Sequence, residues 1–423
     1  MTFADSTLAE VCSVITDGAH NSPKSVEDAG LPMASVKDLR SWGIDFNTCR
    51  HISKTDFELL VRQGCKPKQG DVLIAKDGAT ALDTVCVVKK EEDVVLLSSV
   101  AILRPNPQRI QSNFLRYFLE NPSTTSFMKG GLITGAAIPR VVLKDFKRCP
   151  IRVPNLESQE ATSFILSAYD DLIENNTRRI KILEQMAQML YREWFVYYRF
   201  PDHENVQMVG SEAEPIPRGW EVMTVADFGI VVTGKTPTTE RIDYFGGDIP
   251  FIKTPDMHGN IFCLQVSESL SLLGAKSQEK KMLPENSIIV NCIGALAGSV
   301  SITTRDCQTN QQINAVVLTD QSTREYLYLS LVGLRDALRQ IGSNGATMIN
   351  VNKSKFEGLQ VKTPPEELMR QFHALTFPLF ESIKNLHLKN TILKQTRDLL
   401  LPKLVSGEIS VEQIEQEVVA EMV

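Results

Sequence analysis

The sequence predicts an α+β fold with a pseudo-twofold internal repeat: two similar mixed α/β domains joined by two long antiparallel coiled-coil helices. Three observations support this prediction: a repeated motif, a repeated order of strands and two long heptad patterns. The motif Gly135-Ala136-Ala137-Ile138-Pro139-Arg140-Val141 recurs 210 residues later as Gly345-Ala346-Thr347-Met348-Ile349-Asn350-Val351. A chain that repeats a motif at a fixed offset is expected to repeat its fold.

The order of strands repeats together with the motif. Apolar runs bounded by Gly or Pro indicate buried strands, and amphipathic stretches indicate short helices. The predicted elements are strands at 71–75, 94–103, 287–290 and 315–318, and helices at 113–119 and 325–340. The offset between the halves drifts from 210 to about 216, which places insertions in loops, where repeats of one fold usually differ.

Two stretches with a heptad pattern predict long helices. The first runs from 157 to about 200 and the second from 365 to about 401, so each spans roughly 55–65 Å at 1.5 Å per residue. Each helix could pack on its own domain, but two such helices in one chain favour a mutual antiparallel pair. Asn176 interrupts the first heptad, and Pro378 is expected to bend the second helix. The residues predicted to pack between the helices are Ile173, Ile180, Leu183, Leu190, Trp194, Leu379, Leu386, Leu393 and Leu400.

The chain therefore divides into six predicted segments. They are a first domain at 1–156, a first spacer helix at 157–200, a linker at 201–217, a second domain at 218–364, a second spacer helix with a C-terminal segment at 365–409, and an acidic tail at 410–423.

Charge is distributed unevenly along the 423 residues, whose net charge is −6. Residues 1–156 contain 20 Lys+Arg and 17 Asp+Glu, for +3, and within them 101–156 contributes +7. Residues 404–423 contribute −5 from five Glu. The acidity is partly local, so a basic face that binds nucleic acid is compatible with the composition.

The bulk sequence also argues against a membrane or secreted protein. No apolar stretch reaches about 18 residues, and the N-terminus lacks the basic and apolar regions of a signal peptide. The eight cysteines are scattered singly without a CxxC pair, and several lie within apolar runs. We expect buried free thiols in a reducing cytoplasm.

The strongest formal motif match is to a phosphate-binding P-loop at Gly229-Ile230-Val231-Val232-Thr233-Gly234-Lys235-Thr236. A P-loop requires a helix directly after it, because the helix N-terminus binds the phosphates. The following residues, 237–247, show no amphipathic period. Thr233-Gly234 also occupies the place of Asp17-Gly18 in the first domain, so a strand and turn shared by both repeats explains the match better.

The sequence contains no other catalytic or metal-binding signature. The function class that remains is binding, and nucleic acid is the ligand that the polar loops suit. Basic, amide and hydroxyl side chains gather in loops of both domains. Arg and Lys bind phosphates, and Asn, Gln, Arg and Lys also read base edges. Solvated polar loops are the simpler alternative for any one of these residues. The candidate DNA-contacting residues are His20, Lys24, Lys76, Lys144, Lys147, Arg148, Lys235, Thr236, Arg241, Lys253, Gln311, Gln312, Asn350, Asn352 and Lys353.

Several segments in this order resemble the DNA-specificity subunit of type I restriction–modification systems across essentially the whole chain. They include Thr233-Gly234-Lys235-Thr236-Pro237, Thr309-Asn310-Gln311-Gln312-Ile313-Asn314 and the ending Leu400-Leu401-Pro402-Lys403-Leu404-Val405-Ser406-Gly407-Glu408-Ile409. The first domain departs from the pattern, since the strand after Asp77-Gly78-Ala79-Thr80 lacks the Asn-Gln-Gln.

The resemblance implies two target-recognition domains that each read one half of a bipartite, asymmetric site in double-stranded DNA. The helices would set the gap between the half-sites and dock methyltransferase (modification) subunits, and an endonuclease/translocase (restriction) subunit would join that complex. The chain itself would hold no cofactor and catalyse no reaction. The alternatives are a self-contained P-loop NTPase or DNA methyltransferase, and a coiled-coil scaffold that does not bind DNA.

Overall fold

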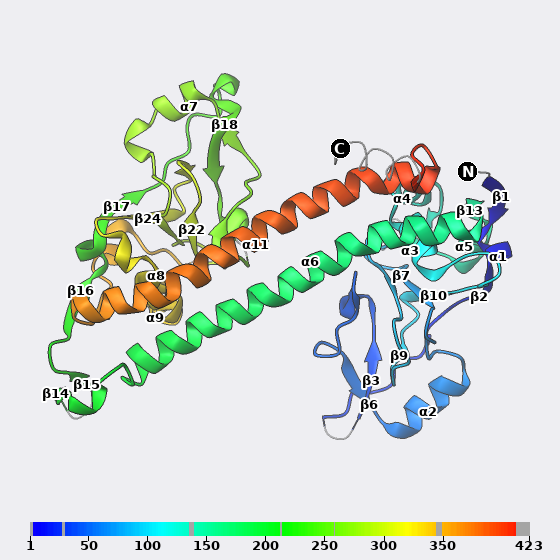
Figure 1. Ribbon diagram of the computed structural model, residues 1–423, viewed down its shortest axis with the longest axis horizontal. Coiled ribbons are helices and arrows are strands. Elements are labelled where there is room, and N and C mark those ends of the chain that lie inside the picture. The colour runs from blue at the N-terminus through cyan, green and yellow to red at the C-terminus, as the bar shows by residue number, and fades with distance from the viewer. Residues whose placement is uncertain are drawn as a thin grey trace, which may run out of the picture. The chain divides into compact units, whose positions relative to one another are not determined.

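The computed structural model describes residues 3–27, 30–134, 139–211, 214–257, 259–343 and 349–411. The chain forms two compact units: unit 1 comprises Met1–Asn175 and Thr391–Val423, and unit 2 comprises Asn176–Asn390. Two long helices, α6 (Leu156–Tyr191) and α11 (Glu366–Ser406), contribute a part to each unit (Figure 1). Parts of the repeated motif (135–138 and 345–348) and residues 412–423 of the acidic tail lie outside the described residues.

Unit 1 contains the first α/β domain. Its elements before α6 are β1 (Phe3–Thr7), α1 (Leu8–Val11), β2 (Cys12–Asp17), β3 (Leu31–Ala34), η1 (Val36–Asp38), β4 (Leu39–Arg40), β5 (Gly43–Ile44), β6 (Arg50–Ile52), α2 (Lys54–Arg62), β7 (Val72–Ala75), β8 (Val85–Val87), β9 (Val95–Leu96), β10 (Val100–Pro105), α3 (Ser112–Glu120), α4 (Pro122–Gly131), β11 (Ile133–Thr134), β12 (Arg140–Val141), α5 (Leu143–Arg148) and β13 (Pro150–Pro154).

A four-stranded antiparallel sheet in the order β2-β10-β7-β8 forms the centre of unit 1. All four residues of β7, Val72-Leu73-Ile74-Ala75, are buried. Alternate residues of this strand contribute to two separate cores, one of which contains Phe114 of α3. Burial on both faces explains why the strand is apolar throughout and does not alternate.

Unit 2 contains the second α/β domain. Its elements between the long helices are η2 (Arg192–Val196, a π-helical turn), η3 (His203–Asn205), β14 (Met208–Ser211), β15 (Glu214–Pro217), β16 (Glu221–Thr224), η4 (Val225–Phe228), β17 (Gly229–Thr233), η5 (Ile242–Tyr244), β18 (Phe245–Ile252), η6 (Thr254–Met257), β19 (Phe262–Cys263), β20 (Ser269–Leu270), α7 (Leu272–Lys276), η7 (Glu279–Lys281), β21 (Ile288–Asn291), β22 (Val300–Thr303), β23 (Gln308–Thr309), β24 (Ile313–Leu318), η8 (Gln321–Thr323), α8 (Arg324–Gly333), α9 (Arg335–Ser343), α10 (Lys353–Glu357) and β25 (Gln360–Thr363).

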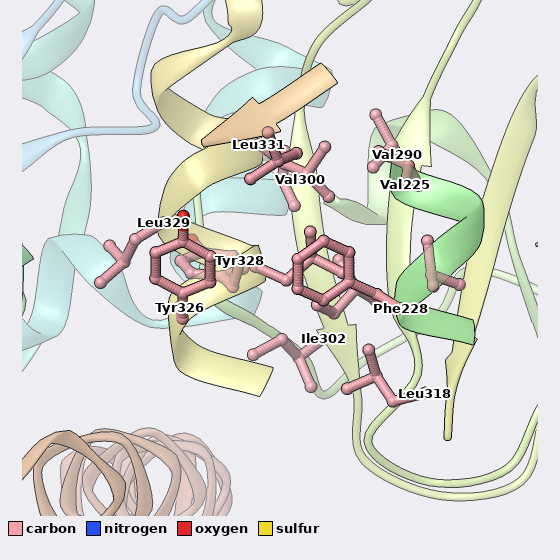
Figure 2. Packing of buried hydrophobic residues seen from close by; sticks show 14 of the residues in the cluster. Val225, Phe228, Val290, Val300, Ile302, Leu318, Tyr326, Tyr328, Leu329 and Leu331 are labelled. Atoms are coloured by element: carbon pink, nitrogen blue, oxygen red, sulfur yellow. The ribbon is translucent and has the colours of Figure 1, made fainter. Parts of the chain in front are cut away.

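A five-stranded sheet in the order β17-β24-β21-β22-β19 forms the centre of unit 2, antiparallel except for the pair β19 and β22. Helix α8 covers one face of this sheet. Figure 2 shows Tyr326 and Leu331 of α8 in one cluster with Ile302 and Leu318 of the strands and Phe228 of η4. Each such buried side chain stabilises the fold by roughly 1.5–3 kcal/mol.

The two units share one framework. The order β2-β10-β7-β8 matches β17-β24-β21-β22, and the pair β1–β13 matches the pair β16–β25. Even the local capping repeats: the backbone N–H and hydroxyl of Thr7 both donate to Glu10, and those of Thr224 both donate to Asp227. The predicted internal repeat of an α+β fold is therefore confirmed.

Within unit 2 the long helices run antiparallel in contact. Asn176 Nδ2 donates to Asn390 Oδ1 at 2.9 Å, and the Tyr191 ring lies 6.4 Å from that of Phe372. As the residue number rises along α6, that of its partner on α11 falls. Because an Asn pair in an apolar seam is satisfied only in one alignment, it specifies the register of the helices.

Within unit 1 a partly buried ionic cluster attaches both helices to the domain. Asp170 of α6 accepts from Arg397 of α11 at 2.7 Å, and from Arg116 and Tyr117 of α3 at 2.9 and 2.8 Å. Burial alone would raise the pKa of Asp170, but the two guanidinium groups and the Tyr117 hydroxyl lower it overall. The carboxylate therefore stays ionised and holds three elements together.

The residues predicted to pack between the helices differ in burial. Ile180, Trp194 and Leu386 are buried; Leu183, Leu190 and Leu379 are half-buried against the same core; Leu400 is half-buried in unit 1; Ile173 and Leu393 are half-buried.

Three element predictions differ from the structure. The single strand predicted at 94–103 is two strands, β9 and β10, since a turn at 98–99 lets β9 pair with β3 in another sheet. The helix predicted at 325–340 breaks at Leu334 into α8 and α9. The stretch 201–217, predicted as a linker, contains the hairpin β14–β15.

Candidate nucleic-acid interface

Polar side chains gather at one end of the unit 2 sheet. Strands β17 and β21 end there and β24 begins there, because neighbouring strands are antiparallel. An isolated bridge between Ile293 and Asn350 brings the segment before α10 to the same place. We call this region the polar end of unit 2; it comprises Thr233–Thr236, Asn291–Ile293, Asn310–Asn314 and Asn350–Asn352.

Hydrogen bonds join the loops of the polar end of unit 2. Thr236 Oγ1 donates to Gln311 Oε1 at 2.7 Å, and the Lys235 backbone N–H donates to the Thr309 carbonyl at 2.9 Å. A Cβ on Gly234 would lie 2.1 Å from the Asn310 carbonyl oxygen, so only glycine permits this approach. Four of the candidate contact residues, namely Lys235, Thr236, Gln311 and Gln312, thus meet in one place, next to Asn350.

The P-loop interpretation fails on the same loop. Strand β17 ends at Thr233, and the next helical element is the 3₁₀ turn η5, which begins at Ile242. No helix N-terminus follows Thr236 to bind phosphates, and Gly234 serves loop packing instead.

The equivalent end of the unit 1 sheet is charged. Lys76 Nζ lies 3.3 Å from Asp17 Oδ2 and 3.4 Å from Asp77 Oδ2, and Arg140 bonds both oxygens of Asp77 at 3.0 and 3.1 Å. His20 Nε2 lies 3.3 Å from Asp17 Oδ1. The hydrogen bonds to Asp77 raise the pKa of Arg140 above its usual value. We call Asp17, His20, Lys76, Asp77 and Arg140 the charged end of unit 1.

Backbone hydrogen bonds show that the two ends correspond. The Lys76 N–H donates to the Ser99 carbonyl at 2.9 Å, and the Cys292 N–H donates to the Gln312 carbonyl at 2.8 Å. Lys76 of unit 1 therefore occupies the place of Cys292 in unit 2. One framework presents ionic side chains in unit 1, and amides and hydroxyls in unit 2.

The candidate contact residues of unit 1 lie in three settings. Lys76 is buried between its two carboxylates, whereas His20 and Lys24 are exposed after β2. Three further cations, Lys144, Lys147 and Arg148, are exposed on α5, which follows β12.

Several candidates in unit 2 are already paired. Arg241 bonds Asp243 through two nitrogens, at 2.8 and 2.6 Å, and Lys253 lies 2.7 Å from Glu268. Asn352 caps α10, and Lys353 lies 3.4 Å from Glu357 on that helix. These ion pairs are exposed or half-exposed, so separating each cation from its carboxylate costs about 1 kcal/mol or less.

Sequence reasoning missed several residues at the two ends. Asp17, Asp77 and Arg140 were not among the candidates, although the repeat aligns Arg140 with Asn350, which was. Thr254 and Asn291 of unit 2 join the hydrogen-bond network only through tertiary contacts. The repeat offset could have revealed Arg140, but nothing local in the sequence marks Thr254.

The buried thiols are not suited to nucleophilic chemistry. All eight cysteines are free and buried. Burial raises the pKa of Cys292 to about 11 and that of Cys12 to about 12, so both are protonated at neutral pH. Within the described residues, no three His, Cys, Asp or Glu side chains are placed to hold a metal ion.

No helix in the described part of the chain is both long and apolar enough to span a bilayer. The long helices α6 and α11 each carry many charged residues, which excludes them as spans.

Comparisons with known proteins agree with the duplicated architecture. The family model for the type I restriction modification DNA specificity domain matches twice, at residues 2–185 and 217–392. The HindI specificity subunit of Haemophilus influenzae is 30% identical over 402 residues, covering 81% of this chain and 87% of the relative. The MjaIX specificity subunit of Methanocaldococcus jannaschii is 28% identical over 309 residues, covering 72% of this chain and 71% of the relative.

A solved structure shows the same fold. The crystal structure of a type I restriction–modification S subunit from M. genitalium superimposes with a TM-score of 0.63 at 14% identity, covering 96% of both chains. The two family matches span most of the sequence, and the family consists of non-catalytic specificity subunits and not of NTPases or methyltransferases. This chain therefore belongs to the family of DNA specificity subunits of type I restriction–modification systems.

Proposed function

We propose that each α/β domain reads one half of a bipartite, asymmetric site in double-stranded DNA. The observation that carries this proposal is that the two units share one framework but present different side chains at equivalent positions. Lys76, Asp77 and Arg140 stand in unit 1 where Cys292, Ile293 and Asn350 stand in unit 2. Similar frames with different donors and acceptors favour different base sequences. The two DNA-reading domains in this proposal are the predicted ones, residues 1–156 and 218–364.

Sequencing the sites that are methylated by the chain together with its methyltransferase subunits tests this proposal. We expect one site with two defined halves separated by unspecified bases. Binding to that site should weaken steeply with salt, because basic side chains displace counterions from the phosphates. A single continuous recognition sequence, or no sequence preference, would contradict the proposal.

We propose further that the helices dock two copies of one partner, the methyltransferase subunit. Two exposed apolar residues on α6, Ile182 and Met189, have repeat equivalents on α11, Ile392 and Leu399. Their exposed fractions are 49%, 64%, 62% and 69%. Apolar side chains so exposed at equivalent positions are expected to be covered by a partner. The duplication offers that partner two similar surfaces, one in each unit.

The helix pair is also proposed to set the distance between the half-sites. Its register is specified by the Asn176–Asn390 pair, and deletion of 172–178 together with 388–394 removes both asparagines and one heptad from each helix. Seven residues correspond to about 10.5 Å of helix, which is about three base pairs at 3.4 Å per base. We expect the gap in the methylated sites to shorten by about that amount, and an unchanged gap would show that the helices are not the spacer.

Catalysis in this proposal belongs to other chains. The methyltransferase subunits would hold S-adenosylmethionine, and an endonuclease/translocase subunit would join the complex and hydrolyse ATP. A cytoplasmic location, where the DNA and these partners meet, is supported by eight cysteines that remain free thiols.

A further inference from the structure

The side chain of Gln312, at the polar end of unit 2, is held in one orientation by its own loop. Its backbone is fixed on both sides: the N–H donates to Asn310 Oδ1 at 3.1 Å, and the carbonyl accepts from the Cys292 N–H at 2.8 Å. The half-buried side chain therefore starts from a rigid position.

The hydrogen bond to the Gln312 backbone decides which way the two amides face. Asn310 uses its Oδ1 on that N–H, so its Nδ2 must point the other way, and it donates to Gln312 Oε1 at 3.2 Å. Thr254 Oγ1 also approaches Gln312 Oε1 at 3.2 Å, although its single hydrogen is shared with Asn291 Oδ1 at the same distance. Rotating the Gln312 amide by half a turn would set one NH₂ group against another, which is repulsive.

The amino group of Gln312 consequently faces outward. Among the described residues no acceptor bonds Gln312 Nε2. The buried polar atoms that lack a partner do not include this nitrogen, so it is accessible to solvent. A free glutamine reads adenine with its oxygen and its nitrogen together. Here the oxygen is turned inward, so Gln312 offers hydrogen-bond donors alone.

We propose that Gln312 is a specificity-determining residue that reads acceptors on one base in the major groove, with guanine preferred. Guanine presents two acceptors there, O6 and N7, whereas thymine presents one at O4, and the cytosine N4 group is a donor that repels the amino group. A free amide would contact adenine N6 with its oxygen and N7 with its nitrogen. Because the Gln312 oxygen is turned inward, only the contact to N7 is left for adenine. This inference rests on the proposed reading of DNA by unit 2.

Unit 1 has no equivalent of the Asn310–Gln312 amide pair, so this pair affects only the half of the site that unit 2 reads. Ser99 occupies the place of Gln312, as the matching hydrogen bond from Lys76 shows, and Leu97 stands in the place of Asn310. Neither side chain can reproduce the paired amides.

Base preference of the assembled complex on a library of randomised half-sites tests the proposal. Gln312→Glu keeps the oxygen that Asn310 holds and replaces the outward amino group by an acceptor. We expect one base position in one half-site to change from guanine to cytosine, with discrimination of about 10- to 100-fold. Asn310→Ala releases the amide, and the same position should then admit adenine.

Gln321→Glu is the matched control, since Gln321 is exposed beyond the opposite end of β24 and gains the same charge. It should leave every position unchanged. Unaltered base preference in Gln312→Glu, or an equal loss of affinity for all four bases, overturns the role of Gln312 while the reading of DNA stands. Absence of sequence preference in the unsubstituted complex overturns the proposed function instead.

Discussion

Single residues decide where the secondary-structure elements of this chain begin and end. Helix α6 begins after Asn155, whose Oδ1 accepts from the Ser158 backbone N–H at 2.8 Å. Helix α11 ends where Gly407 adopts a φ of 77°. A left-handed residue at this place lets the chain turn and satisfies the last carbonyl groups of the helix.

Gly407→Ala tests the second of these signals. The positive φ disfavours any side chain, and a Cβ would lie 2.3 Å from Phe3 Cε2. We expect a loss of about 1–2 kcal/mol in the free energy of unfolding, measured by denaturant titration. Ser406→Ala, an exposed neighbour, serves as the control, and adding Phe3→Ala to Gly407→Ala should recover part of the loss. Full stability in Gly407→Ala would contradict the strained turn.

The environments of single residues were the least predictable from the sequence. Lys76 was chosen as a contact for its charge, yet it lies buried between Asp17 and Asp77. The orientation of Gln312 depends on Asn310 and Thr254, and the latter is 58 residues away. Residue type shows what a side chain can bind, but its partner across the fold decides what remains available.

At the scale of elements, prediction succeeded where a pattern was long or repeated. The two helices followed from heptads, and the paired sheets followed from apolar runs such as 71–75 and 287–290. Prediction was wrong where a short turn divides one apolar run, as between β9 and β10. Such a break depends on which sheet each piece joins, and the periodicity of the sequence does not contain that information.

Glu184 of α6 provides a test of the helix environment through pH. Burial raises the pKa of this carboxyl above its usual value of 4.5. The protonated Glu184 carboxyl is tolerated in the folded protein, whereas its ionised form is destabilising. The free energy of unfolding is therefore highest below pH 4.5, and it falls as pH rises through the raised pKa of the folded protein. We therefore expect Glu184→Gln to raise the melting temperature at pH 7 and not at pH 4. An equal effect at both pH values would contradict this origin.

The two faces of α11 can be separated by one pair of substitutions. Leu386 is buried against the helix pair, whereas Ile392 is exposed. Leu386→Asp buries an unpaired charge and should lower the free energy of unfolding by about 3–5 kcal/mol. Ile392→Asp should leave thermal stability within about 0.5 kcal/mol and weaken binding of the methyltransferase subunit. Equal stability losses in a melting experiment would show that the two positions share one environment.

At the scale of the whole molecule, duplication explains the repeated fold and suits the proposed reading of two half-sites. Each unit contains the same framework of four antiparallel strands, to which unit 2 adds β19, and each contains part of both α6 and α11. Similar frames can bind similar DNA shapes, while the charged end of unit 1 and the polar end of unit 2 differ in the chemistry that they present. If the two domains read DNA as proposed, a gene duplication followed by divergence at the sheet ends would produce an asymmetric recognition site.

The separate reading of two half-sites is tested most directly by exchanging residues 218–364 for the equivalent domain of a relative. Both long helices remain native, so the complex with the methyltransferase subunits should still assemble. Sequencing the methylated sites should show a change in one half only, with the other half and the gap between them unchanged. A change in both halves, or in neither, would contradict the account.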